Sequence, residues 1–227
     1  MTVILVLATF LVFIVLDYAM NRRKAMVTVP MEASQAAAVP ALSGQAGDFV
    51  NGFHTPDNLS YHPGHAWLVR ERKNVVRVGA DEFAAALLGG IEKIELPKPG
   101  TWVRQGQKVL AFFRNGVKTE MVSPTEGEVM EVNAEALNNP AVVRQDPYGK
   151  GWLLSVHVPD EENTGRNLVP KGLIREWMGD AVERLYGMQP VLAGAVAADG
   201  GRPADDVFAA LPEVDWKAAT GEFFLTL

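Results

Sequence analysis

Residues 108–122, KVLAFFRNGVKTEMV, decide the fold because two strand-like runs flank an Asn-Gly pair. The runs at 109–114 and 117–122 are rich in β-branched and aromatic residues, which favour strands. Asn115-Gly116 is a strong signal for a two-residue turn, because both residues tolerate a positive φ. The stretch therefore predicts a tight β-hairpin.

Short strand-like runs continue on both sides of this hairpin, separated by turn residues. Residues 66–70 and 75–79 predict a second hairpin. Residues 81–88 (DEFAAALL) suit a short helix with Asp81 as N-cap and Gly89-Gly90 as its stop. Further strands are predicted at 93–96, 128–132 and 153–158. Many short, closely spaced strands predict a mainly β domain, either a sandwich or a barrel, with small helices.

The C-terminal part changes to helical periodicity. Residues 172–186 place apolar side chains, Trp177 among them, three or four positions apart, which predicts an amphipathic helix. Residues 204–211 predict a further short helix. The tail contains Phe223 and Phe224, which are unusually apolar for a free terminus. We expect such a tail to dock, either on its own domain or on a partner.

The N-terminus carries an uncharged run, TVILVLATFLVFIVL at residues 2–16, followed by a basic trio. With its flanking residues this run is long enough to span most of a bilayer as a helix. No basic residue precedes it, which favours a retained anchor over a cleaved signal peptide or a buried soluble helix. The basic trio then places the main domain in the cytoplasm, at the inner membrane, with the N-terminus outside. The predicted membrane residues are Val3, Ile4, Leu5, Val6, Leu7, Phe10, Leu11, Val12, Phe13, Ile14, Val15, Leu16, Arg22, Arg23 and Lys24.

Composition sets further limits on the 227-residue chain. The absence of cysteine excludes disulfides and thiolate metal sites. The net charge of −6 argues against nucleic-acid binding, which needs clustered Lys and Arg. The mean hydropathy of +0.04 is slightly high, and we attribute the excess to the anchor. Residues 25–58, rich in Ala, Pro, Gly and Ser, predict a linker.

Side chains for catalysis or metal binding are sparse. His54, His62 and His65 lie within twelve residues, but a metal site would need further ligands. The sequence contains no Gly-rich phosphate loop, nucleophile elbow or HExxH motif. We therefore expect a protein without catalytic residues, and a metal- or small-molecule-binding sensor domain remains a third hypothesis.

Several motifs occur in an order that resembles the glycine cleavage H-protein family. They include YHPGHAW at 61–67, IELP at 94–97, GEVMEVN at 127–133 and DPYGKGWL at 146–153. The resemblance covers residues 59–160 and implies a lipoyl-type barrel-sandwich hybrid fold with short helices. One transmembrane helix (1–24) and a linker (25–58) precede this domain, and a helical extension (161–227) follows it.

The resemblance also implies a lipoyl group on a lysine at the tip of a β-hairpin. That lysine position falls on Gly116 in this sequence, and the glutamate usual three residues earlier is replaced by Phe113. Lys118 lies on the same strand face as Gly116, displaced by about 7 Å along the strand. We therefore expect no cofactor, with a lipoyl group on Lys118 as the alternative.

Besides the sensor hypothesis, two functions remain open. The first is a membrane-tethered, non-catalytic subunit whose degenerate lipoyl-type domain docks protein subunits of a larger membrane complex. The second is a genuine lipoyl carrier, related to glycine cleavage and modified at Lys118. For the docking function, the candidate contact residues are Phe113, Arg114, Asn115, Gly116, Trp177, Phe223 and Phe224.

Overall fold

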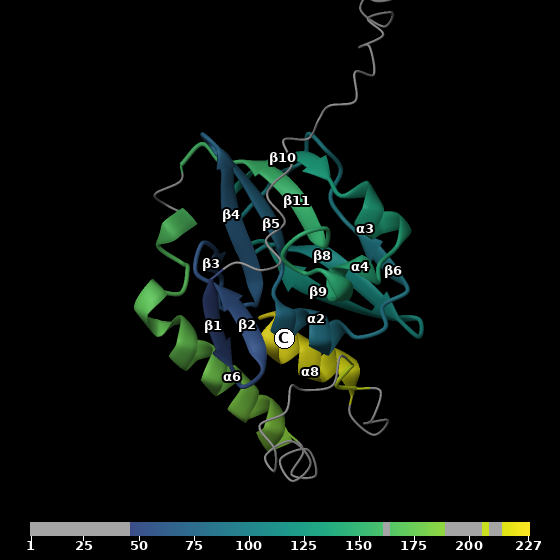
Figure 1. Cartoon of the computed structure of the whole chain (residues 1–227). Coiled ribbons are helices and arrows are strands. Elements are labelled where there is room, and N and C mark those ends of the chain that lie inside the picture. Colours follow the sequence, from purple (N-terminus) through teal and green to yellow (C-terminus); the bar gives the residue numbers. More distant parts are fainter. Residues whose placement is uncertain (1–45, 161–163, 189–205, 209–214) are drawn as a thin grey trace, which may run out of the picture. The chain divides into compact units, whose positions relative to one another are not determined.

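The computed structural model describes residues 46–160, 164–188, 206–208 and 215–227, whose strands form three antiparallel sheets (Figure 1). The smallest sheet is the hairpin of β1 (Gly47–Val50) and β2 (Phe53–Pro56). The three-stranded sheet has the order β6 (Lys93–Glu95), β8 (Lys108–Arg114) and β9 (Val117–Val122). The six-stranded sheet runs in the order β3 (Ser60–Tyr61), β4 (Ala66–Arg72), β5 (Val75–Ala80), β11 (Trp152–His157), β10 (Gly127–Val132) and β7 (Trp102–Val103).

Short helices connect and cover these sheets. The described helices are α2 (Glu82–Leu88), α3 (Ala134–Asn138), α4 (Val142–Gln145), the 3-10 turn η1 (Lys171–Leu173), α6 (Ile174–Met188) and α8 (Trp216–Phe223). The predicted N-cap of α2 is confirmed, because the Asp81 carboxylate accepts a hydrogen bond from the Ala84 amide at 2.7 Å. Gly89 ends the helix with a φ of 59°.

One hydrophobic core joins both larger sheets and the helices. Alternate side chains of β8 and β9, such as Leu110, Phe112 and Met121, are fully buried. Val78 and Leu154 enter the same core from the six-stranded sheet. The mainly β fold with short helices, predicted from the strand spacing, is therefore confirmed.

The predicted linker at 25–58 is wrong for its last part. β1 and β2 lie within it, and Phe53 is buried with its ring edge-on to Phe83 at 5.3 Å between centroids. These strands belong to the folded domain, because β2 packs against α2 through Phe53 and Phe83. The remainder of the linker lies outside the described residues.

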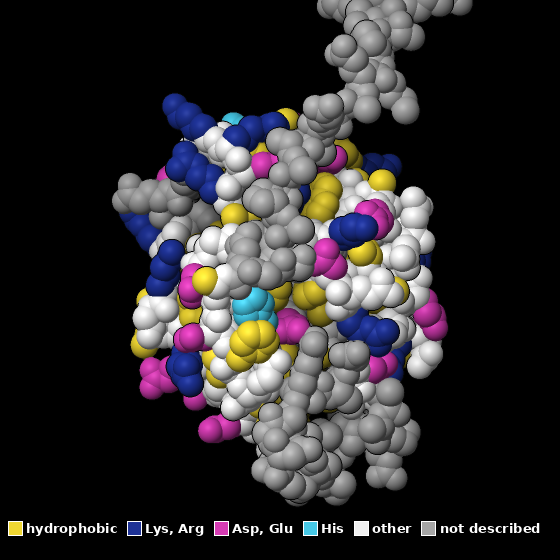
Figure 2. All heavy atoms as spheres, in the orientation of Figure 1, with side chains coloured by type: hydrophobic (Ala, Val, Ile, Leu, Met, Phe, Trp, Pro, Cys, Tyr) yellow, Lys and Arg dark blue, Asp and Glu magenta, His cyan; other side chains and the backbone are white. Residues whose placement is uncertain are grey.

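The predicted membrane anchor at 1–24 also lies outside the described residues, as does most of the predicted helix at 204–211. Among the residues that the structure does describe, no helix has the length and apolar character needed to cross a bilayer. The face of the described part drawn in Figure 2 carries acidic and basic side chains interspersed with hydrophobic ones.

The C-terminal tail docks on its own domain. Phe223 and Phe224 are 1% and 0% exposed, and the Trp216 indole nitrogen of α8 donates to the Leu87 carbonyl at 2.9 Å. Figure 1 shows α8, in yellow, packed below α2. Of the two docking possibilities for the tail, the structure supports the intramolecular one.

Candidate functional site

The tip of the β8–β9 hairpin is the two-residue turn that the Asn-Gly pair predicts. Arg114 pairs with Val117, and Asn115 and Gly116 have φ angles of 50° and 74°. Positive φ at both positions is the mark of a type I′ turn. A Cβ added at Gly116 would meet no atom within 4 Å, so the tip projects into open space.

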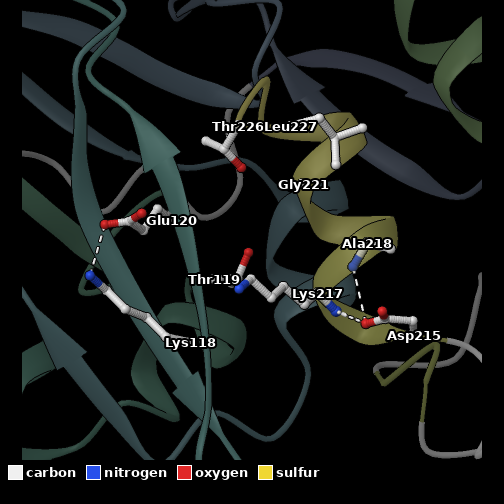
Figure 3. Close-up of a pocket in the computed structure, with 9 residues that line it drawn as sticks. All are labelled: Lys118, Thr119, Glu120, Asp215, Lys217, Ala218, Gly221, Thr226 and Leu227. Carbon is white, nitrogen blue, oxygen red and sulfur yellow. Dashed lines mark hydrogen bonds and ion pairs between the residues drawn. The ribbon is translucent and has the colours of Figure 1, made fainter.

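Lys118 lies beside the tip, not on it. Its Nζ is 2.8 Å from Glu120 Oε1, two residues further along β9 (Figure 3). The hydrogen bond to Glu120 raises the pKa of the Lys118 ammonium. The amine is therefore held along the strand in its charged form.

The other hairpin residues that we predicted as contact residues are engaged within the chain. The Arg114 guanidinium binds Asp206 at 2.8 Å, and Asp206 also accepts a hydrogen bond from the Gly90 amide. Phe113 is half-buried, with Lys93 Nζ 5.0 Å from its ring centroid. The exposed parts of this hairpin are therefore its turn and the outer face of its strands. Arg114 instead holds the hairpin to the C-terminal segment through Asp206.

A groove of about 240 Å³ lies between β9 and α8, and Figure 3 shows the residues that line it. Lys118, Thr119 and Glu120 contribute from β9, and Lys217 and Ala218 from α8. Asp215 is the N-cap of α8, and its carboxylate accepts hydrogen bonds from the amides of Lys217 and Ala218. Our sequence reasoning missed this helix, although Asp215 before an apolar run is an N-cap signal.

The aromatic residues predicted as partner contacts, Phe223 and Phe224, belong instead to the core. Phe223 lies edge-on to Phe83, with 5.1 Å between ring centroids. Trp177 of α6 is half-buried, and its ring stacks on His65 at 4.6 Å. The prediction that Phe223 and Phe224 contact a partner is therefore wrong. Both rings are buried in the core of their own domain, where Phe223 packs near His65.

The clustered histidines are explained by hydrogen bonding and packing. His65 Nδ1 lies 2.9 Å from Asp81 Oδ2, with both side chains fully buried. His62 Nδ1 accepts a hydrogen bond from the Gly64 amide at 3.0 Å. Burial, and to a smaller extent the neighbouring His65, lowers the pKa of His62 to about 4. Within the described ranges, no three His, Asp or Glu side chains are placed to hold a metal ion.

Comparison with known proteins gives a consistent match. The family model described as "Glycine cleavage H-protein" matches residues 59–180, which includes the first part of α6. The chain is 37% identical to the glycine cleavage system H protein of Bifidobacterium longum over 107 residues, 47% of this chain and 77% of that protein. It is 33% identical to the H protein of Pectobacterium atrosepticum over 119 residues, 52% of this chain and 92% of that protein.

Among solved structures, the chain is similar to a crystal structure of a glycine cleavage system H protein from Mycobacterium marinum. The match has 28% identity and a TM-score of 0.48, and it covers 56% of this chain and 98% of that chain. The family match spans more than half of the sequence and includes the motifs at 61–67, 94–97, 127–133 and 146–153. This chain belongs to the glycine cleavage H-protein family.

Proposed function

We propose that this chain is a non-catalytic accessory subunit whose H-protein-like domain serves for docking. The observation that carries the proposal is the hairpin tip, where Asn115 and Gly116 form an open type I′ turn. A lipoyl group is attached through an amide bond to a primary amine, and neither residue of this turn has one. The tip therefore does not fit the group that the family resemblance implies.

Lys118 is a poor substitute for a lysine at the tip. Its ammonium is engaged by Glu120 at 2.8 Å and lies along β9, about 7 Å from the turn by strand geometry. An enzyme that recognises an amine at the apex of the hairpin would meet a glycine there. We therefore assign no carrier step to this chain.

The membrane part of the proposal comes from the sequence. The uncharged run at 2–16 and the basic trio that follows it favour a single anchor, with the domain on the cytoplasmic side. A tethered domain gains effective concentration toward a fixed neighbour, which suits a subunit of a membrane complex better than a diffusing shuttle. The protein subunits of that complex are those that co-purify with this chain from its membranes.

Intact-mass measurement of the chain, purified from its own membranes, tests the absence of the cofactor. We expect the mass of the unmodified polypeptide. An added lipoyl group, mapped to Lys118 by peptide sequencing and absent from Lys118→Arg, would overturn the proposal in favour of a carrier.

The docking role is tested by purification from membranes in mild detergent, with identification of co-purifying proteins. We expect one or more subunits in fixed proportion to this chain. A chain that remains in the membrane fraction after alkaline washing, yet elutes without any other protein, would contradict the docking role while leaving the anchor intact.

A further inference from the structure

The outer face of the three-stranded sheet carries a patterned set of side chains. Lys93 of β6 lies opposite Phe113 of β8, and Phe113 lies opposite Lys118 of β9. We call these three residues the lysine row. The ring at its centre is half-buried, and Lys93 Nζ lies 5.0 Å from the ring centroid.

A second row crosses the same strands two residues away. Glu95 lies opposite Ala111, and Ala111 lies opposite Glu120. We call these three residues the glutamate row. Its centre, Ala111, is a small residue that is 6% exposed, and a groove of about 230 Å³ beside it is lined in part by all three residues of the row.

Both rows point to the same side of the sheet. The Nζ–Oε1 distances are 2.6 Å for Lys93–Glu95 and 2.8 Å for Lys118–Glu120, which joins the rows along two strands. The alternate residues, Ile94, Phe112 and Thr119, are buried in the core. The four charged side chains are 34–62% exposed. The charged side chains of the outer face, defined as the two rows together, are therefore accessible to another molecule.

We propose that the outer face binds a second copy of this chain, around a twofold axis that crosses the strands between the two rows. Rotation about this axis places each lysine row over the glutamate row of the other copy. Lys93 then faces Glu95 of the second copy, and Lys118 faces Glu120. The Phe113 ring enters the hollow over Ala111. Charge and shape are thus both self-complementary, as an isologous interface requires.

Two twofold axes can bring the outer faces of two copies together, and the charge pattern favours the one that crosses the strands. A twofold axis parallel to the strands would place Lys93 over Lys118 of the second copy and Glu95 over Glu120. Opposed like charges repel each other, which disfavours that arrangement.

The contact is small, since six residues make up its centre, and it falls below the size of a stable interface. We therefore expect weak self-association that declines as salt is raised and the charges are screened. This inference deepens the proposed docking role by naming the partner at one face. If the chain does not self-associate, the docking role is still tested separately by the mass measurement and by the purification from membranes.

Paired charge substitutions in the full-length chain, in mild detergent, provide the test. Glu95→Lys/Glu120→Lys makes both rows basic, and Lys93→Glu/Lys118→Glu makes both acidic. Each variant alone should self-associate more than tenfold more weakly than the original chain in sedimentation equilibrium, which is about 1.4 kcal/mol. An equimolar mixture should recover the dimer, because a basic face then meets an acidic one.

The quadruple variant Lys93→Glu/Glu95→Lys/Lys118→Glu/Glu120→Lys distinguishes the two axes. It should dimerise with itself and not with the original chain, because matching rows would then carry equal charge. Binding of the quadruple variant to the original chain would overturn the proposed axis. Self-association that is unchanged in both double variants, or absent in the original chain, would overturn the dimer. Circular dichroism of each variant verifies that these exposed substitutions leave the fold intact.

Discussion

The Thr119 hydroxyl of β9 lies 2.7 Å from the Thr220 hydroxyl of α8, and both side chains are buried. Thr220 also donates to the Trp216 carbonyl at 2.7 Å, so Thr119 acts as the donor in the pair. This hydrogen bond connects the strand next to the hairpin tip with a helix 101 residues away in sequence. The C-terminal helix is therefore a structural support for the hairpin.

Replacing Thr220 with Val should lower the free energy of unfolding by about 1–3 kcal/mol, because the buried Thr119 hydroxyl loses its acceptor. Urea unfolding followed by tryptophan fluorescence measures the change. The double variant Thr119→Val/Thr220→Val should recover part of the loss, because no buried donor remains unpaired. Additive losses in the double variant would show that the two hydroxyls are not coupled.

Phe223→Ala should destabilise the chain by about 3–5 kcal/mol, because it leaves a cavity beside Phe83 in the core. Leu227→Ala is the matched control, since Leu227 is 87% exposed and its loss should change stability by less than about 0.5 kcal/mol. Thermal unfolding of both variants measures the difference. Equal, small effects would mean that the tail is not packed as described.

Acid should destabilise the chain through His62. The pKa of His62 is about 4 in the folded chain and about 6.5 when unfolded, so the unfolded state binds the proton first as pH falls. The contribution is present above pH 6.5 and is lost progressively toward pH 4, up to about 3 kcal/mol.

The His62→Asn variant isolates this effect, because its amide oxygen can still accept from the Gly64 amide but does not titrate. Unfolding free energies measured from pH 7 to pH 4 should show a shallower slope for the variant than for the original chain. Identical slopes would contradict the assignment of the pH dependence to His62.

Gly116→Lys should be accepted sterically at the tip, because a Cβ there meets no atom within 4 Å. The φ of 74° costs an L-residue about 1 kcal/mol, so we expect a loss of that size in the free energy of unfolding. Gly116→Asn should cost less, because Asn tolerates this conformation.

The same Gly116→Lys variant tests whether the hairpin keeps the shape of a carrier. When it is expressed together with lipoylation enzymes, we expect its mass to increase by one lipoyl group, while the original chain stays unmodified. An unmodified variant, beside a modified ordinary H protein from the same cells, would mean that the hairpin has lost that geometry.

Local signals made much of the fold predictable. The Asn115-Gly116 pair determined the central turn, Asp81 determined the start of α2, and the strand runs lie close to their predicted bounds. These features depend on residues adjacent in sequence. β1 and β2 were missed because each has only four residues, and because β1 packs on α6 and β2 on α2, which both come later in the chain.

The candidate site was less predictable for the same reason. The lysine row requires the pairing register of three strands, and β6 joins β8 across the intervening β7 in sequence. The burial of Phe223 depends on α2 and α6, which a reading of the tail alone does not place. The sequence identified an apolar tail, and only the three-dimensional packing decided what the tail covers.

The burial of Phe223 and Phe224 in a core made of earlier residues has a consequence for biosynthesis. The strands leave the ribosome well before α8, so they emerge without the rings that complete their core. That core closes only once α8 has also emerged. Until then the aromatic surface around His65 is exposed to chaperones.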